Sequence, residues 1–308
     1  MVISSENHPL VEVKHLSHRY STDWAIRDIN FELAENKIVG LLGSNGAGKS
    51  TLMNIICGVL TQTKGQVLIN GWDINKNSTE AKKQIGFLPQ KPPLHIDLSV
   101  QEYLEFAANI RLIPNKQVKK SVDEVLDKCG LKHFRHRLIK NLSGGYQQRV
   151  GIAQSIIHNP KFIVLDEPTN GLDPNQILEI RKLIQEISYG KIVLLSTHIL
   201  QEVQAMCHDI IMIELGHFVF EGTVEEFNNS LTSKTLVIAF ENEPNVEDLL
   251  SIEGISAIDA IDDKKFRIHL STEESIQHRI VTEAFKNGWQ IVEIYKEKIN
   301  ADEIFKHF

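Results

Sequence analysis

The residues with the clearest chemical meaning in this chain form a glycine-rich run that ends in a lysine and two hydroxyls. Residues 43–51 fit the pattern G-x-x-x-x-G-K-[ST], in which the backbone N–H groups of a curled loop surround a polyphosphate. In this pattern Lys49 reaches the β- and γ-phosphates, and the Ser50 hydroxyl holds Mg²⁺. The candidate phosphate-binding residues are Gly43, Ser44, Asn45, Gly46, Ala47, Gly48, Lys49, Ser50 and Thr51. The run predicts a nucleotide site but specifies neither the nucleotide nor the reaction.

The segments on either side of the loop have the character that the motif requires. Residues 38–42 are apolar apart from one glycine and predict a buried strand, whereas Leu52, Ile55 and Ile56 recur at helical spacing. A helix that begins near Lys49 directs the positive end of its dipole at the bound phosphate. The order strand, glycine loop, helix therefore supports the prediction.

Two adjacent carboxylates follow a second buried segment. Residues 162–165 form a continuous apolar run, typical of a strand buried on both faces, and Asp166 and Glu167 come directly after it. Such a pair is expensive to bury unless a cation compensates it. Asp166 fits the Mg²⁺ role of the carboxylate in phosphate-loop NTPases, and Glu167 fits the role of a group that polarises an attacking water.

A third apolar run, residues 192–195, is followed by His198. A lone histidine after a strand is usually structural, although beside a bound phosphate it becomes a polar clamp. Open α/β sheets bind ligands beyond the carboxyl ends of their strands. We therefore expect residues 43–51, Asp166, Glu167 and His198 to converge on one triphosphate.

Four further residues are ambiguous when each is taken alone. Tyr20 is an ordinary strand-end aromatic or a platform for a nucleobase. Ser143, followed by Gly144 and Gly145, is a helix N-cap or part of a second anion site. Asp173 before a proline is explained as a helix N-cap, and Gln90 carries no signal by itself.

The remaining segments predict a helical insert and a small tail. Ser99 and Glu102 form a capping box, and residues 97–142 have helical spacing, so a helical subdomain is expected at about residues 97–158. After Ser230 the pattern changes to strand, helix, strand, strand, helix, strand, with the second helix at 273–287. This order predicts a ferredoxin-like sandwich.

Composition indicates an ordinary globular protein. The 308 residues are 42% hydrophobic and 24% charged, and the net charge of −7 argues against nucleic acid as the main partner. The isolated Cys57, Cys129 and Cys207 have no metal-ligand spacing and suggest a reducing compartment. Because residues 1–9 lack the features of a signal peptide and no apolar run is long enough to span a membrane, we expect a cytoplasmic protein.

As a set, these motifs resemble the ATPase subunit of ATP-binding cassette (ABC) transporters over residues 10–230. In family terms the matches are the phosphate loop at 43–51, the Q-loop at Gln90, the signature motif at 142–145, the Walker B strand at 162–167, the D-loop at 171–174, the switch histidine at His198 and the adenine-stacking aromatic at Tyr20. Tyr146 stands where the commonest signature has Gln, a variant that occurs in the branch that this chain resembles. Residues 145–151 and 171–177 look closest to the gliding-motility and multidrug-type exporter ATPases.

The resemblance implies an α/β fold, namely a P-loop NTPase core with a mixed sheet, an antiparallel β subdomain and the inserted helical subdomain. It assigns residues 8–230 to an ATPase domain, and the pattern of strands and helices after it predicts a small C-terminal α+β accessory domain at 231–308. It also implies two copies that sandwich two ATP molecules head to tail, so that each ATP lies between one phosphate loop and the partner's copy of Ser143, Gly144, Gly145 and Asp173. Glu167, His198, Gln90 and Lys49 would then be catalytic, and Ser50, Gln90 and Asp166 would position Mg²⁺ directly or through water.

The implied partners are a second copy and integral membrane permease subunits, which would place the chain at the inner face of the cell membrane. A non-transport ATPase of the family that acts on DNA or ribosomes is the main alternative. The short helical insert and the single phosphate loop count against it. A nucleotide sensor with little turnover is a third class, and the intact Glu167 and His198 count against it.

Overall fold

The computed structural model describes residues 9–230, 232–242, 244–271 and 276–298. The expectations for the first eight residues and for the start of the helix at 273–275 lie outside this part of the chain. Contacts within the chain divide it into two units, Met1–Val224 and Glu225–Phe308, and each is described separately. The division lies at the start of helix α8 (Val224–Ser230), whereas the sequence interpretation set it at the end of this helix.

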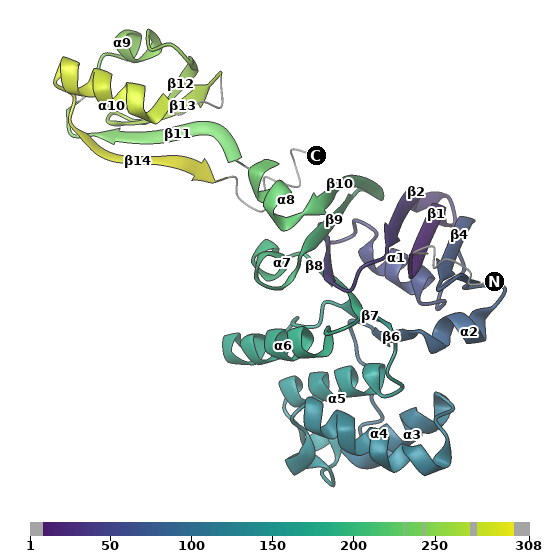
Figure 1. Ribbon diagram of the computed structural model, residues 1–308. Coiled ribbons are helices and arrows are strands. Elements are labelled where there is room, and N and C mark those ends of the chain that lie inside the picture. Colours follow the sequence, from purple (N-terminus) through teal and green to yellow (C-terminus); the bar gives the residue numbers. More distant parts are fainter. Residues whose placement is uncertain (1–8, 231, 243, 272–275, 299–308) are drawn as a thin grey trace, which may run out of the picture. The chain divides into compact units, whose positions relative to one another are not determined.

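A mixed sheet of six strands forms the centre of the first unit (Figure 1). Its order is β10 (His217–Thr223), β9 (Asp209–Glu214), β3 (Ile38–Leu42), β8 (Ile192–Thr197), β7 (Phe162–Asp166) and β6 (Ile85–Leu88). All neighbours are parallel except β9 and β10. The predicted buried strands β3, β7 and β8 lie together, so their carboxyl ends share one edge of the sheet.

Alternate side chains of these central strands contribute to two different cores. Ile163 and Val193 pack with the helical region, whereas Val164 and Leu194 pack with the antiparallel strands and α1 (Lys49–Ile56). A strand with an apolar core on each face must be apolar at every position. This requirement explains the continuous apolar runs of the sequence.

A second sheet of the first unit is antiparallel. Its order is β2 (Asp23–Leu33), β1 (Val11–Tyr20), β4 (Lys64–Ile69) and β5 (Trp72–Asp73). The pairing of β1 with β2 continues to Tyr20, opposite Asp23. After Val13 the pairing has register shifts, which interrupt the alternation of buried and exposed side chains along β1. The polar Ser17 and His18 are therefore buried within the strand.

The helices of the first unit pack on the central sheet or on one another. They are α1, α2 (Ser78–Lys83), α3 (Val100–Ile110), α4 (Asn115–Lys128), α5 (Gly144–Ile156), α6 (Pro174–Ile187) and α7 (Leu200–Met206). The predicted capping box is present, because Ser99 caps α3 and Glu102 bonds back to its backbone. In Figure 1, α3, α4 and α5 lie together, apart from β1 and β2. Among the helices of the described residues, none combines the length and the apolar character that crossing a membrane requires.

The second unit follows the order that the sequence predicted. Its elements are β11 (Thr232–Phe240), α9 (Val246–Leu250), β12 (Ile255–Asp262), β13 (Lys265–Leu270), α10 (Ile276–Asn287) and β14 (Ile291–Lys298). The sheet order is β12-β13-β11-β14 with all pairs antiparallel, which is the arrangement of a split βαβ sandwich. Leu236, Ile238, Phe266 and Ile280 are among its core residues.

We predict that Gly86→Ala destabilises the first unit by about 1–3 kcal/mol or more. A Cβ atom on Gly86 in β6 would lie 2.2 Å from the Ser155 carbonyl oxygen and 2.9 Å from the Pro160 ring, so α5 would have to move away from the sheet. Denaturant unfolding of the full chain measures the effect. Gly144→Ala is the control, because its Cβ would meet only Leu172, at 4.0 Å. Equal unfolding midpoints for the two variants would contradict this packing.

Candidate nucleotide-binding site

The glycine loop connects β3 to α1 and is enclosed by neighbouring backbone. Gly46 and Gly48 have φ angles of +87° and +107°, in the region that favours glycine. A Cβ on Gly48 would lie 2.6 Å from the Ala25 carbonyl oxygen, and one on Gly43 would lie 2.3 Å from the carbonyl oxygen of Ile213. The loop therefore needs these glycines for its own packing as well as for close approach to a phosphate.

Lys49 is the buried cation of the site. Its Nζ donates hydrogen bonds to the carbonyl oxygens of Gly43 and Ser44, at 2.8 and 2.9 Å. Burial lowers the pKa of Lys49, and the carboxylates of Glu167 and Asp166 oppose that shift. The structure thus brings together the loop lysine and both carboxylates that the sequence predicted.

Glu214, at the end of β9, is a carboxylate of this region that the sequence analysis missed. It accepts hydrogen bonds from the Ser44 backbone N–H at 3.2 Å and from the Ser44 hydroxyl at 2.8 Å. A signal for it existed, because it directly follows the apolar run 210–213. This is the same pattern, a polar residue just beyond a buried strand, that identified Asp166.

Asp166 and Glu167 are fixed by a serine of the neighbouring strand β8. Asp166 is 4% exposed, and its Oδ1 accepts a hydrogen bond from the Ser196 hydroxyl at 2.5 Å. The same hydroxyl accepts from the Glu167 backbone N–H at 3.0 Å. Glu167 has a φ angle of +47°, a strained conformation for a residue with a side chain, so the surrounding contacts must hold it.

Three loops deliver hydrogen-bond donors to the Glu167 carboxylate. Gln90 Nε2 and Asn170 Nδ2 donate to Oε2, at 2.9 and 3.0 Å. His198 Nδ1 lies 3.1 Å from Oε1, and because a carboxylate only accepts, this nitrogen carries the proton. The predicted Gln90, Glu167 and His198 therefore meet in space, and Asn170 joins them without having been predicted.

The predicted second anion site lies elsewhere. Ser143 and Gly145 line a small hollow with Gln176 at the start of α5, and no residue of the loop at 43–51 is among the described residues that line it. Ser143 occupies the N-cap of α5, but within the described chain its side chain accepts no capping hydrogen bond. Gln148 in α5 links this helix to the carboxylate region, because its side chain donates to the Pro168 carbonyl oxygen at 2.8 Å.

The last two predicted residues are placed by local structure. Tyr20 ends β1, is 53% exposed and packs edge-on against His18 with ring centroids 4.7 Å apart. Asp173 caps α6, because its Oδ1 accepts from the backbone N–H groups of Asn175 and Gln176, both at 3.0 Å. The N-cap explanation of Asp173 is confirmed.

We predict that Ser196→Ala lowers the free energy of unfolding by about 1–3 kcal/mol, because it leaves the buried Asp166 carboxylate without its hydroxyl donor. Ser155→Ala is a matched control. Ser155 is equally buried, but its hydroxyl donates only to the Ile152 carbonyl oxygen within its own helix. Denaturant titrations of both variants measure the difference. A loss for Ser196→Ala no larger than that for Ser155→Ala would contradict the assigned contact.

Comparison with known proteins identifies the family. A family profile described as ABC transporter matches residues 26–170. The lipopolysaccharide export system ATP-binding protein LptB of Haemophilus influenzae is 34% identical over 225 residues, which are 71% of this chain and 93% of that protein. The uncharacterized ABC transporter ATP-binding protein YhcH of Bacillus subtilis is 31% identical in an alignment of 305 positions, which covers 87% of this chain and 99% of that protein.

A solved structure supports the same conclusion. The dimeric post-hydrolysis state of the ATP-binding cassette MJ0796, bound to ADP and phosphate, has a TM-score of 0.63 and 28% identity, and it covers 70% of this chain and 98% of that chain. The fold, the nucleotide-binding motifs and the sequence similarity over most of each relative all indicate the same family. This chain therefore belongs to the ABC transporter family, as an ATP-binding protein with ATPase activity.

Proposed function

We propose that this ATPase subunit works as a head-to-tail dimer with two ATP molecules at its interface and that it drives an exporter through separate membrane permease subunits. The observation that carries the hydrolytic part of the proposal is the convergence of donors from three loops on the Glu167 carboxylate. Such a group, held beside the phosphate-binding lysine, suits the activation of a water molecule.

In the proposed reaction Glu167 orients and deprotonates the water that attacks the γ-phosphate. Gln90 and Asn170 hold the carboxylate in place, and His198, with a proton on each ring nitrogen in this proposal, donates from Nε2 to the γ-phosphate while Nδ1 donates to Glu167. Lys49 exchanges its two loop carbonyls for phosphate oxygens. These roles need no rearrangement of the sheet, because every group already lies at its carboxyl edge.

The residues at this edge also fit Mg²⁺. Ser50 offers a hydroxyl, Asp166 a carboxylate and Gln90 an amide oxygen, since its nitrogen is engaged by Glu167. Oxygen ligands of this kind suit Mg²⁺, which uses few protein ligands and keeps phosphates and waters. Among the described residues, no group of three His, Cys, Asp or Glu side chains is arranged as a metal site, which is compatible with such a ligand-poor ion. When bound, Mg²⁺ neutralises charge on the phosphates.

The dimer is supported by the separation of the two anion sites within one chain. Ser143, Gly144 and Gly145 would complete the ATP site of a second copy, with Asp173 beside them and Tyr20 stacked on the adenine of its own chain. The related cassette MJ0796 is dimeric in its solved structure. Export is supported by the similarity to LptB, the ATP-binding protein of a lipopolysaccharide export system.

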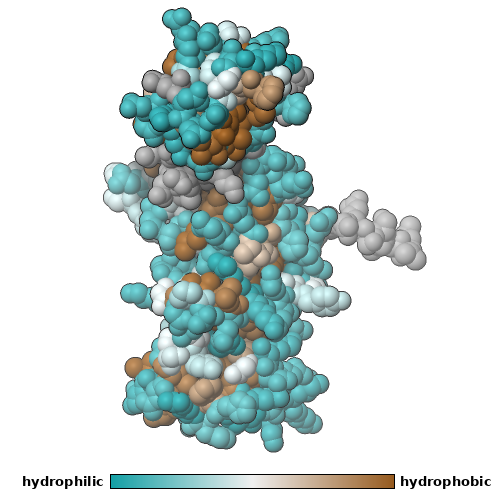
Figure 2. Space-filling view, turned by 90° about the vertical axis from the view of Figure 1, so that its left-hand side faces the viewer, coloured by the Kyte–Doolittle hydropathy of each residue, from teal (hydrophilic) through white to brown (hydrophobic). Residues whose placement is uncertain are grey.

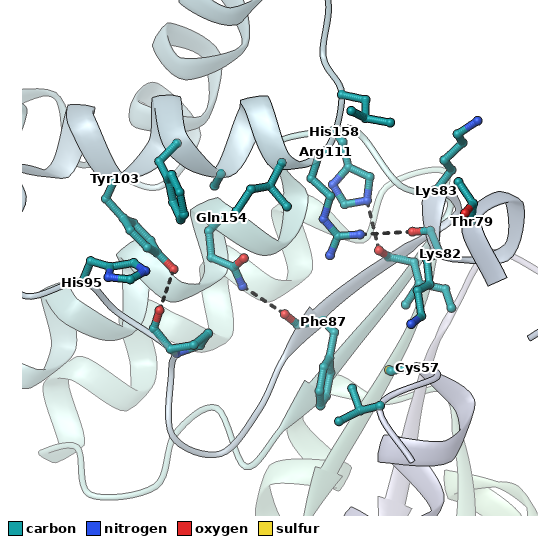
Figure 3. Close-up of a pocket in the computed structure, with 17 residues that line it drawn as sticks. Cys57, Thr79, Lys82, Lys83, Phe87, His95, Tyr103, Arg111, Gln154 and His158 are labelled. Atoms are coloured by element: carbon teal, nitrogen blue, oxygen red, sulfur yellow. Dashed lines mark hydrogen bonds between the residues drawn. The ribbon is translucent and has the colours of Figure 1, made fainter. Parts of the chain in front are cut away.

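A groove of about 640 Å³ is the proposed contact for the permease (Figure 3). Its apolar wall comes from α3, with Phe106 and Ile110, and Lys82, Lys83 and Arg111 are its charged residues. No carboxylate is among the described residues that line it. We therefore propose that a cytoplasmic segment of the permease inserts apolar side chains here and presents an acidic residue to the cations.

The groove is connected to the catalytic carboxylate through the loop that carries Gln90. Phe87 and Pro93, on either side of Gln90, line the groove, and their carbonyl oxygens accept hydrogen bonds from Gln154 at 3.0 Å and from Tyr103 at 3.1 Å (Figure 3). A displacement of an occupant would move this loop and therefore the donor on Glu167.

Figure 2 shows one face of the molecule, with apolar patches on a largely hydrophilic surface.

We propose that residues 231–308 form an accessory domain, which supports the dimer, contacts a partner or regulates the subunit. The match to YhcH, which covers 87% of this chain and 99% of that protein, supports its place in a common architecture. Together these proposals place the chain at the inner face of the cell membrane.

We predict that Glu167→Gln retains ATP binding but lowers kcat for ATP hydrolysis by about 10²- to 10⁴-fold, because the amide no longer accepts a proton. Glu186→Gln, on the exposed side of α6, is the charge-matched control. Nucleotide affinity and steady-state ATPase activity of the purified chain measure both quantities. Near-normal turnover of Glu167→Gln would overturn the assignment of the base.

We also predict that Phe106→Asp abolishes copurification of an integral membrane protein from detergent-solubilised membranes, since it places a charge in the apolar wall of the groove. Tyr189→Asp, 93% exposed and outside the groove, should retain the partner. Mass spectrometry would identify the copurified protein. A permease recovered equally well with both variants would place its contact elsewhere.

A further inference from the structure

A second buried carboxylate lies next to the catalytic loops but has no part in the proposed chemistry. Glu202, in α7, is 1% exposed. Its Oε1 accepts a hydrogen bond from the Thr169 hydroxyl at 2.5 Å, and its Oε2 accepts one from the Thr197 hydroxyl at 2.9 Å. A buried carboxylate is unfavourable unless its partners compensate it, so the choice of these two partners is informative.

One threonine lies in the loop that carries Glu167, and the other ends β8, directly before the loop that carries His198. Thr169 is two residues after Glu167, and Thr197 directly precedes His198. The loops meet twice, once through the bond between Glu167 and His198 at 3.1 Å and once through the Glu202 carboxylate. Glu202 therefore bridges, within the protein interior, the same two loops that Glu167 and His198 join at the nucleotide site.

The position of the nearest positive charge shows that Glu202 does more than balance a buried cation. Arg181 is the cation that faces Glu202, but its guanidinium lies 3.8 Å from Oε1, and among the described buried atoms its Nε has no hydrogen-bond partner. A carboxylate that served only to balance this arginine would make a shorter, charge-assisted bond. Instead the two short bonds go to the neutral hydroxyls of the catalytic loops.

The backbone of the first loop needs such an anchor. Glu167 has the strained φ angle of +47°, which costs about 1–3 kcal/mol and persists only where the surroundings hold it. On its N-terminal side the bonds to Ser196 hold the residue. On the C-terminal side, Thr169 is tied to Glu202.

We infer that Glu202 is a positioning residue, which holds His198 against Glu167 by fixing Thr197 and Thr169 at a constant separation. The inference rests on the proposed roles of Glu167 and His198. Because Glu202 is 1% exposed, we assign it no contact with the nucleotide. Its loss should therefore lower kcat and leave ATP binding nearly unchanged, because a small misplacement of catalytic groups costs up to about a hundredfold in rate.

Steady-state ATPase assays of the purified full chain test this inference. Glu202→Ala and the isosteric Thr169→Val should each lower kcat about ten- to a hundredfold, with the KM for ATP and the measured ATP affinity close to wild type. Thr169→Ser restores the hydroxyl and should restore most of the activity. Thr169→Val removes only one hydroxyl, so the test stands even if Glu202→Ala does not fold.

A double-mutant cycle with His198→Ala shows whether the effect passes through the catalytic pair. If Thr169 acts through His198, adding Thr169→Val to His198→Ala should lower kcat by much less than it does in the wild type. Two outcomes would overturn the inference and leave the proposed role of His198 intact. In one, the two substitutions lower kcat by independent factors that multiply in the double variant. In the other, Thr169→Val keeps a kcat within about twofold of wild type although His198→Ala is slow. An unchanged kcat for His198→Ala would overturn the proposed role of His198 and the inference with it.

Discussion

The site depends on one constraint, the position of the Glu167 carboxylate where three loops end. Gln90, Asn170 and His198 reach it from the loops after β6, β7 and β8. Only neighbouring parallel strands can bring three such loops to one point, because their carboxyl ends share an edge. The strained backbone at Glu167 is held by the bond of its N–H to Ser196 and by the bond of Thr169 to Glu202. The sheet thus sets the distances between the Glu167 carboxylate and its hydrogen-bond donors.

Negative charge is in excess at this edge of the sheet, which suits a nucleotide that is bound together with a divalent cation. Lys49 is surrounded by the carboxylates of Asp166, Glu167 and Glu214, all of which act on its pKa against the effect of burial. One ammonium and three carboxylates would repel a polyphosphate by themselves. A divalent cation that accompanies the nucleotide removes this repulsion, which gives the proposed Mg²⁺ a physical reason beyond the resemblance to the family.

Two mechanical connections end on the same short segment after β7. From one side, the groove lined by Phe87 and Pro93 leads through Gln90 to Glu167. From the other, α5 carries the proposed partner-facing glycines and contacts the Pro168 carbonyl oxygen through Gln148. In the proposed dimer, permease contact and dimer contact would therefore act on the carboxylate through separate paths.

The sequence by itself determined the elements and the chemistry that depend on local pattern. Residues 43–51 and the polar residues after the buried runs could be predicted, because a buried strand is apolar throughout and a phosphate loop has a fixed spacing. Only the tertiary structure decided the roles of Glu214 and Glu202, whose partners lie 170 and up to 33 residues away. It also decided that Ser143 lies apart from the loop at 43–51. Hydrogen bonds between residues that are far apart in the chain produce no repeating pattern in the sequence. Only the folded sheet brings such residues together.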